Sequence, residues 1–354
     1  MKKLLALCLA LIICLCAFSA CDDVSGAGEA EESMILSDED DTTGGDDTTD
    51  GEEDDSGNES EDDETEGPGA VHPLDGKKII FIGNSHNYYG KAVLDKGTKV
   101  LTQEERSNDR GYFYQLCRSN GAEVSVTNWT FGSHGFTDLF VKCGVDSSCK
   151  GKDHLSYLTD RSFDYVVMQY GTKSEEGFLE NCRMVMDVFK AANENVKFIF
   201  HVQRRAHELD YLWLSEVKEL ENMGVTIVDW GGLVDGLIRG DITVPGAEQT
   251  YDQNSFIVRK SADDGYHPNM LTGYITTLSI YCAITGESAV GQDYSFCGDT
   301  RISTEFNFMN FIYKYYTYKE ATTNFDAIFQ SEADMRGIQQ LIDAYLAEKS
   351  YRNY

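Results

Sequence analysis

The apolar run at residues 78–83, KIIFIG, constrains what this chain can fold into more than any other segment. A continuous apolar run of this length is typical of a parallel strand that is buried on both faces. It ends at Gly83 and leads directly into Asn84, Ser85 and His86. Because ligands of open α/β sheets bind beyond the carboxyl ends of the strands, Ser85 stands where chemistry is expected.

Further strand-length apolar runs alternate with segments of helical spacing, which indicates βαβ units and an α/β fold with about five parallel strands. The expected strands are residues 78–83, 123–128, 164–169, 196–202 and 225–229. The expected helices are residues 111–119, 176–192, 209–223, 268–286 and 331–349. Residues 94–109 and 239–262 are expected to be loops or lids over the carboxyl edge of the sheet. The aromatic-rich segment 306–318 either packs on the core or offers a carbohydrate-stacking face.

Residues 1–20 have the pattern of a secretory signal peptide, with a basic start and an apolar stretch that ends in small residues. Cys21 follows directly, and this junction resembles a bacterial lipobox, in which the cysteine is lipidated. The sequence therefore predicts an exported lipoprotein held at the cell membrane through Cys21 and facing the extracytoplasmic side. Simple cleavage of the signal peptide is the alternative.

The segment after the lipobox, residues 21–70, is expected to be a disordered acidic tether. It carries 22 Asp and Glu and no Lys or Arg between residues 22 and 66, so it has little apolar surface to bury and repels itself. A site for Ca²⁺ or a basic partner is the alternative. The folded domain is expected over residues 71–354, with a helical extension at its end. The domain is acidic as well, which argues against binding to nucleic acid.

Six cysteines lie in the predicted domain, and an exported chain can keep disulfides. Sequence does not choose among their pairings. Cys143 and Cys149 bracket a loop rich in Gly, Asp and Ser and are favoured for a local bridge. A metal site formed by these two cysteines and His154 matches no zinc spacing, so no metal is expected.

The segment SADDGYHPN near the other end of the domain offers partners for Ser85. A serine hydroxyl is a weak nucleophile until a base takes its proton, and that base needs a carboxylate to orient it. Asp264 lies three residues before His267, so His267 can face Ser85 while Asp264 holds its other ring nitrogen. Asp263 is an alternative to Asp264. In the plainer interpretation, Ser85 caps a helix and His267 bonds to the backbone.

These residues resemble the SGNH/GDSL hydrolases over about residues 77–286. The resemblance is carried by Gly83-Asn84-Ser85 after the first strand, a glycine turn after the second strand, and Asp264-x-x-His267 before a late helix. It implies a three-layer α/β/α, flavodoxin-like fold and a serine esterase. It also implies that Ser85 is the nucleophile, with Asp264 and His267 as its partners.

The same resemblance implies an oxyanion hole formed by the N–H groups of Ser85 and Gly132 and by the side chain of Gln169. Gln169 stands where the family has Asn, which points to a divergent branch. Five further residues are expected to contact substrate: Asn84, His86, His134, Tyr170 and His201. Packing or a surface position is the alternative for His86 and His134. Gln203 and Arg204 follow His201 and are expected to touch substrate with it, and a solvated loop start is the alternative for these three.

Export and the family resemblance together predict an esterase that removes O-acetyl groups from carbohydrate, with no metal and no organic cofactor. The expected partners are an acylated carbohydrate or another small ester, and the membrane through the lipid anchor. Two alternatives stay open. One is an O-acyltransferase that uses the same serine, and the other is a non-catalytic carbohydrate-binding lipoprotein.

Overall fold

The computed structural model describes residues 71–87, 93–94, 111–130, 135–140, 161–170, 177–204, 214–257, 268–298 and 331–354. The chain divides into two units, Met1–Thr65 and Glu66–Tyr354, and every described residue belongs to the second. The predicted signal peptide, lipidation site and tether lie outside the described residues, as do the predicted Cys143–Cys149 bridge and the aromatic-rich segment 306–318.

Five parallel strands form one sheet in the order β2-β1-β3-β4-β5, which is the flavodoxin-like order. The strands are β1 Lys78–Gly83, β2 Ser125–Thr130, β3 Tyr165–Met168, β4 Lys197–His201 and β5 Thr226–Val228. β1 lies at the centre, where Ile80 pairs with Thr127 on one side and with Val166 on the other. The predicted α/β class and parallel sheet are confirmed, and β2 starts and ends two residues later than predicted.

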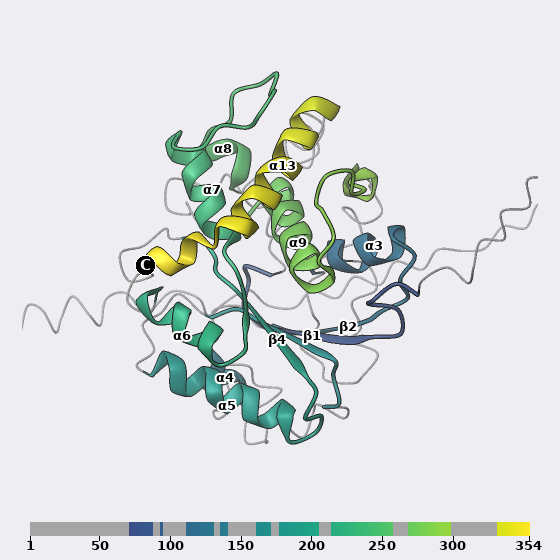
Figure 1. The fold of residues 1–354 in the computed structure, drawn as a ribbon, viewed down its shortest axis with the longest axis vertical. Coiled ribbons are helices and arrows are strands. Elements are labelled where there is room, and N and C mark those ends of the chain that lie inside the picture. The colour runs from purple at the N-terminus through teal and green to yellow at the C-terminus, as the bar shows by residue number, and fades with distance from the viewer. Residues whose placement is uncertain are drawn as a thin grey trace, which may run out of the picture. The chain divides into compact units, whose positions relative to one another are not determined.

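Helices cover both faces of the sheet, so the domain has three layers (Figure 1). One face carries α3 Tyr112–Ser119, α7 Trp230–Arg239, α8 Gln253–Phe256, α9 Met270–Thr285 and α13 Glu332–Glu348. The other carries α4 Phe136–Phe140, α5 Phe178–Lys190 and α6 Val217–Asn222. Short 3₁₀ turns lie at Leu214–Glu216, Ser295–Gly298 and Ser350–Asn353.

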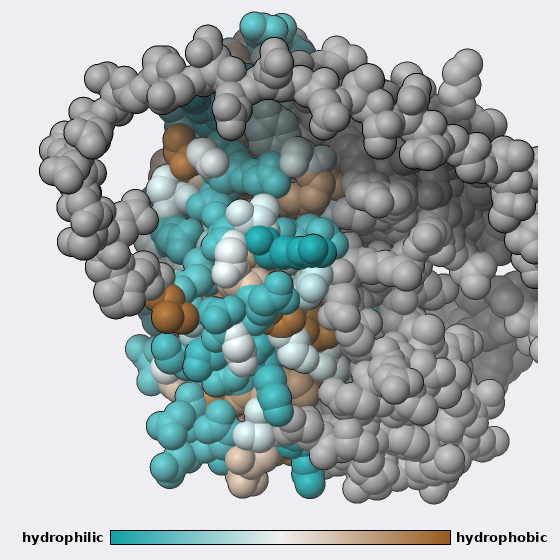
Figure 2. Space-filling view, turned by 90° about the vertical axis from the view of Figure 1, so that its right-hand side faces the viewer, coloured by the Kyte–Doolittle hydropathy of each residue, from teal (hydrophilic) through white to brown (hydrophobic). Residues whose placement is uncertain are grey.

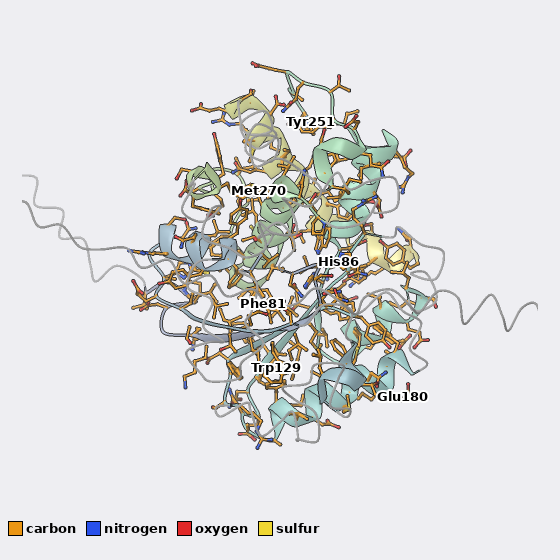
Figure 3. The ribbon with its side chains drawn as sticks, turned by 180° about the vertical axis from the view of Figure 1, so that it is seen from behind. Phe81, His86, Trp129, Glu180, Tyr251 and Met270 are labelled. Carbon is orange, nitrogen blue, oxygen red and sulfur yellow. The ribbon has the colours of Figure 1, made fainter. Side chains whose placement is uncertain are left out.

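The alternation of side chains along the strands divides the core into two parts. Ile79 and Phe81 of β1 pack into the cluster under α3, α9 and α13, whereas Ile80 and Ile82 pack into the cluster under α5 and α6. Figure 3 shows the same division, with Phe81 on one side of the sheet and Trp129 on the other. The continuous apolar run of β1 therefore arises because both of its faces are covered.

Helix α9 is the centre of its layer, because its residues 271–282 are all buried. It follows Pro268 and is capped by Asn269, whose Oδ1 accepts the N–H of Thr272 at 3.0 Å. It packs against both α3 and α13. The predicted helices at 268–286 and 331–349 are confirmed, and Met335, Ile338 and Ile342 of α13 are buried as its periodicity indicated.

Helix α7 was not predicted from the sequence, because its glycine-rich segment WGGLVDGLIR is poor in helix-forming signals. Asp229 caps it by accepting the N–H of Gly232 at 2.9 Å. A Cβ at Gly231 would overlap the carbonyl group of Gln203, so this glycine lets α7 approach the end of β4 closely. The predicted loop at 239–262 contains a short helix, α8.

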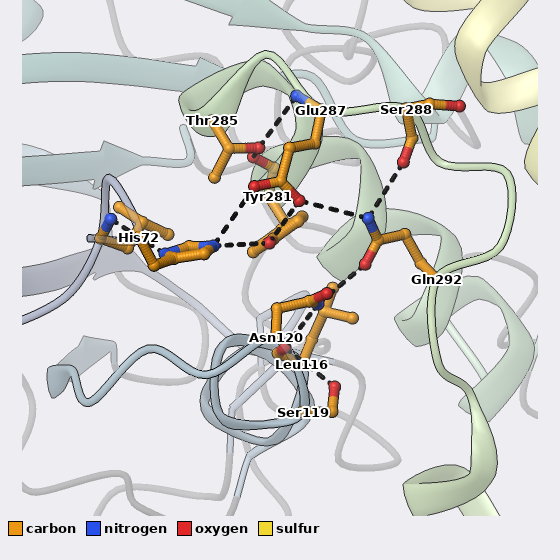
Figure 4. Close-up of polar contacts among 10 residues, drawn as sticks. His72, Leu116, Ser119, Asn120, Tyr281, Thr285, Glu287, Ser288 and Gln292 are labelled. Atoms are coloured by element: carbon orange, nitrogen blue, oxygen red, sulfur yellow. Dashed lines mark hydrogen bonds and ion pairs between the residues drawn. The ribbon is translucent and has the colours of Figure 1, made fainter. Parts of the chain in front are cut away.

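A polar network fastens the start of the domain to the end of α9 (Figure 4). His72 Nε2 lies 2.8 Å from the hydroxyl of Tyr281 and 3.3 Å from Glu287 Oε1, and the Tyr281 hydroxyl donates to Glu287 Oε2 at 2.7 Å. Gln292 continues the network by accepting from Asn120 Nδ2 at 2.8 Å. Residues far apart in the chain are thereby joined at one edge of the domain.

The surface of the described part is mainly hydrophilic. Figure 2 shows one face on which hydrophobic residues occur only in small separate patches among its coloured atoms. Among the described residues, the large apolar side chains that are exposed belong to Val71 and Val290. No helix in the described ranges has both the length and the apolar character that a membrane span requires.

Candidate active site

A tight turn follows β1 and carries Ser85. The N–H of Asn87 donates to the carbonyl of Asn84 at 3.1 Å, and Asn84 Oδ1 accepts the N–H of His86 at 3.2 Å. Asn84, His86 and Asn87 are 4%, 2% and 0% exposed, whereas Ser85 is partly exposed. Of the four residues in this turn, only Ser85 therefore reaches the surface at the carboxyl edge of the central strand.

Gln169, directly after β3, holds this turn with its side-chain amide. Its Oε1 accepts the N–H of Asn84 at 2.9 Å and Nδ2 of Asn87 at 3.1 Å. Its Nε2 donates to the carbonyl of Tyr170 at 2.8 Å and to Oε1 of Gln203 at 2.5 Å. Because a backbone N–H only donates and a carbonyl only accepts, the orientation of the Gln169 amide is fixed.

The structure therefore gives Gln169 a different role from the predicted one. Both hydrogens of its amide are already donated, so it offers none to an oxyanion. It holds the backbone next to Ser85 instead. A Cβ at Gly83 would lie 2.6 Å from Gln169 Oε1 and 2.7 Å from Asn87 Nδ2, which explains why glycine precedes Asn84-Ser85.

His201, the last residue of β4, lies behind the turn. Its Nδ1 accepts from Nε1 of Trp230 at 2.9 Å, and its Nε2 lies 2.8 Å from Oδ1 of Asn87. The ring is buried, and this burial lowers the pKa of His201 to about 3. His201 is therefore neutral and enclosed, which corrects the prediction that it contacts substrate.

Three other predicted pocket residues are also buried around the turn. The ring of Tyr170 packs edge-on against Phe136 and Phe178, with ring centres 5.3 and 4.8 Å apart, so it belongs to the core. Asn84 uses its side chain to brace the turn, and His86 is buried beside it. None of these three residues lies on an open surface.

The remaining predicted site residues lie outside the described residues: Asp264, His267, Gly132 and His134, together with the alternative Asp263. Their roles stay predictions. Described residues resume at Pro268, which forms a bridge with Ile257 immediately before α9.

Sequence reasoning missed two buried residues of this edge, Asn87 and Trp230. Arg204 Nε lies 2.8 Å from Asp235 Oδ1 in a buried ion pair that ties it to α7. Nε2 of Gln203 has no hydrogen-bond partner in the described part of the chain. An unpaired buried donor costs about 1–3 kcal/mol, and a ligand or an ordered water commonly completes such a group.

Neither a metal centre nor a disulfide appears in the described ranges. No three His, Cys, Asp or Glu side chains gather there in a way that would hold a metal ion. The four cysteines in these ranges are buried free thiols: Cys117, Cys182, Cys282 and Cys297.

No protein-family model matches the sequence, and no curated protein matches it. Among solved structures, the chain is similar to a family two carbohydrate esterase from Clostridium thermocellum in complex with cellohexaose. The identity is 14% over 60% of this chain and 64% of that chain, so less than two thirds of the esterase is spanned, and the TM-score is 0.38.

The chain is also similar to a catalytic mutant of Axe2, an acetylxylan esterase from Geobacillus stearothermophilus, with 13% identity over 60% of this chain and 96% of that chain and a TM-score of 0.38. A candidate SGNH hydrolase from Slackia heliotrinireducens gives 14% identity over 60% and 99% of the two chains and a TM-score of 0.36. The chain thus resembles solved carbohydrate esterases, at TM-scores below 0.5 that do not assign it to their family.

Proposed function

We propose that this chain is an SGNH-type serine esterase in which Ser85 attacks the carbonyl carbon of an ester. The observation that carries the proposal is the turn after β1. Ser85 is its one partly exposed residue, and it stands at the carboxyl end of the central strand of a parallel sheet. The residues around it are held by the Gln169 amide. A nucleophile on a rigid turn is positioned for attack before substrate arrives.

The proposed reaction proceeds through an acyl-enzyme. Ser85 Oγ bonds to the acyl carbon while His267 takes the hydroxyl proton, and His267 then protonates the leaving alcohol. Water attacks the acyl-enzyme with His267 again as base, which releases the acid and restores Ser85. Asp264 orients His267, and the N–H groups of Ser85 and Gly132 stabilise the oxyanion.

The proposed substrates are O-acetylated carbohydrates. The predicted export on an acidic tether supports this class, because it would bring the domain to acylated polysaccharide outside the cell. Acetylxylan is the substrate named for one of the solved structures that the chain resembles, so it is the first polymer to test. A lipid anchor at Cys21 is part of the proposal. It predicts that a clickable palmitate analogue labels the wild type and does not label the Cys21→Ser variant.

The enzymatic proposal is tested by release of p-nitrophenol from p-nitrophenyl acetate. We expect Ser85→Ala to lower kcat by about 10³-fold or more, because the nucleophile is lost. The control is Ser119→Ala, which removes a hydroxyl that bonds to the carbonyl of Leu116 at the end of α3 and is expected to keep wild-type kcat. Equal rates for wild type and Ser85→Ala would contradict the role of Ser85.

Product analysis distinguishes the alternatives, because hydrolysis and acyl transfer both release p-nitrophenol and differ only in what receives the acetyl group. Acetyl transfer to an added acceptor sugar, in preference to water, would make the chain an acyltransferase that uses Ser85. A wild-type protein that binds acetylated oligosaccharide but cleaves no ester would be a binding protein, and the esterase proposal would fall.

A further inference from the structure

A chain of hydrogen bonds runs through the buried protein behind the Ser85 turn. Nε1 of Trp230 donates to Nδ1 of His201 at 2.9 Å, Nε2 of His201 meets Oδ1 of Asn87 at 2.8 Å, and Nδ2 of Asn87 donates to Oε1 of Gln169 at 3.1 Å. All four side chains are at most 1% exposed. This hydrogen-bond chain therefore connects the turn to groups that are buried.

The direction of every bond in this chain is fixed. An indole N–H can only donate, so Nδ1 of His201 must accept, and the neutral ring then carries its proton on Nε2. That proton faces Asn87, which must present its amide oxygen and therefore turns its amide hydrogens toward Gln169. Gln169 accepts with the oxygen whose orientation its backbone contacts have already set. Each side chain consequently has a single satisfied orientation.

The hydrogen-bond chain links the turn to three separate elements. Trp230 is the first residue of α7, His201 the last of β4, and Gln169 follows β3. The start of α7 is itself bonded to the residue after β4, because the N–H of Gly231 donates to the carbonyl of Val202 at 3.0 Å. Movement of the turn would break its bonds to His201 and Gln169 together, and Trp230 of α7 holds His201 in place.

Asn87 is the residue that joins the hydrogen-bond chain to the turn. Its N–H closes the turn on Asn84, and its carbonyl accepts the N–H groups of Val93 and Leu94 at 3.0 and 2.8 Å. We propose that Asn87, oriented by His201 and Trp230, is a positioning residue that fixes the backbone around Ser85 for attack on the ester. This inference rests on the proposed function, since it assigns a role in the reaction of Ser85.

Steady-state kinetics on p-nitrophenyl acetate test the inference. Asn87→Ala is expected to lower kcat by about 10- to 100-fold with little change in KM, because a misplaced nucleophile affects the transition state more than substrate binding. His201→Leu breaks two bonds of the chain and is expected to lower kcat similarly. His201→Gln is expected to restore most of kcat, because a glutamine amide also offers one acceptor and one donor.

Gln339→Ala separates positioning from a general loss of stability. Gln339 is a buried amide on α13 that donates to the Tyr274 hydroxyl and the Gln292 carbonyl and accepts from the N–H of Gly291. Its loss is expected to lower Tm while kcat stays at the wild-type value. Wild-type kcat in Asn87→Ala would overturn the inference, as would equal kcat in His201→Gln and His201→Leu. If Asn87→Ala does not fold, the two His201 variants decide.

Hydrogen exchange of the Trp230 indole N–H tests the hydrogen-bond chain without an activity measurement. We expect slow exchange in wild type and His201→Gln and fast exchange in His201→Leu; equal exchange in all three would overturn the inference. Activity that survives Ser85→Ala would instead refute the proposed function, so the two failures are distinguishable.

Discussion

At the scale of single residues, His201 shows how burial fixes a protonation state. Its Nδ1 accepts from the indole N–H of Trp230. A second ring proton would lie on Nδ1 and face that N–H, and two donors cannot form a hydrogen bond with each other. The low pKa of about 3 follows from the burial that keeps water from a charged ring. Neutral His201 thus joins Trp230 to Asn87, and we expect its protonation in acid to destabilise the fold.

We therefore predict that acid destabilises the domain partly through His201. A histidine in an unfolded chain has a pKa of about 6.5. Between that value and about 3, the unfolded chain binds a proton that the folded protein does not. The free energy of unfolding then falls as pH drops through this window, by at most about 1.4 kcal/mol per pH unit from this group.

Denaturant titrations at pH 7 and pH 4.5 measure this effect. The His201→Gln variant cannot bind the proton, so it should lose less stability than wild type between the two pH values. The comparison cancels the titration of all other groups. An identical loss in the two proteins would show that His201 does not carry the effect.

At the scale of elements, the fit of α7 against β4 explains why a glycine-rich segment forms a buried helix. The backbone of Gln203 occupies the space in which a side chain at position 231 would lie. Gly236, about one and a half turns later, faces only a side chain, because a Cβ added there would lie 2.6 Å from Cδ1 of Ile242. A side chain can move aside where a backbone cannot.

This difference predicts opposite outcomes for two substitutions in one helix. Both Gly231→Ala and Gly236→Ala gain about 1 kcal/mol of helix propensity. Gly231→Ala should nevertheless destabilise the protein by about 1–3 kcal/mol, because α7 must shift away from β4. Gly236→Ala should be neutral or better. Thermal unfolding of the two variants checks this, and a stable Gly231→Ala protein would show that the contact is not tight.

The elements also show what the sequence could and could not predict. β1, β3, β4 and β5 were predictable because each contains an apolar run, whereas β2, SVTNWT, is more polar and was predicted two residues too early. Ser85 was predictable because it lies just beyond the carboxyl end of β1. α7 was not predicted because its glycines lower the helix propensity of its segment. The hydrogen-bond chain was not predictable, because Trp230, His201 and Asn87 are far apart in sequence and only the folded sheet brings them together.

At the scale of the whole molecule, both core clusters contain buried free thiols. Cys117, Cys282 and Cys297 belong to the cluster under α9, and Cys182 belongs to the cluster under α5. Burial raises the pKa of all four thiols, that of Cys282 to about 12. In the described ranges these cysteines act as small apolar core residues and do not cross-link the fold.

We accordingly predict that these four cysteines react only when the domain unfolds. Iodoacetamide at neutral pH should leave them unmodified in the native protein and alkylate all four in denaturant, because the reactive thiolate is scarce in the folded state. Peptide mapping by mass spectrometry assigns each site. A disulfide-linked peptide containing any of the four would contradict this description.

The central claim is that Ser85 is the nucleophile of an esterase, and covalent labelling tests it most directly. A fluorophosphonate probe reacts with an activated serine, and mass spectrometry locates the adduct. We predict one adduct on Ser85 in the wild type and none in Ser85→Ala. An adduct on another serine, or esterase activity in a protein whose Ser85 stays unlabelled, would contradict the claim.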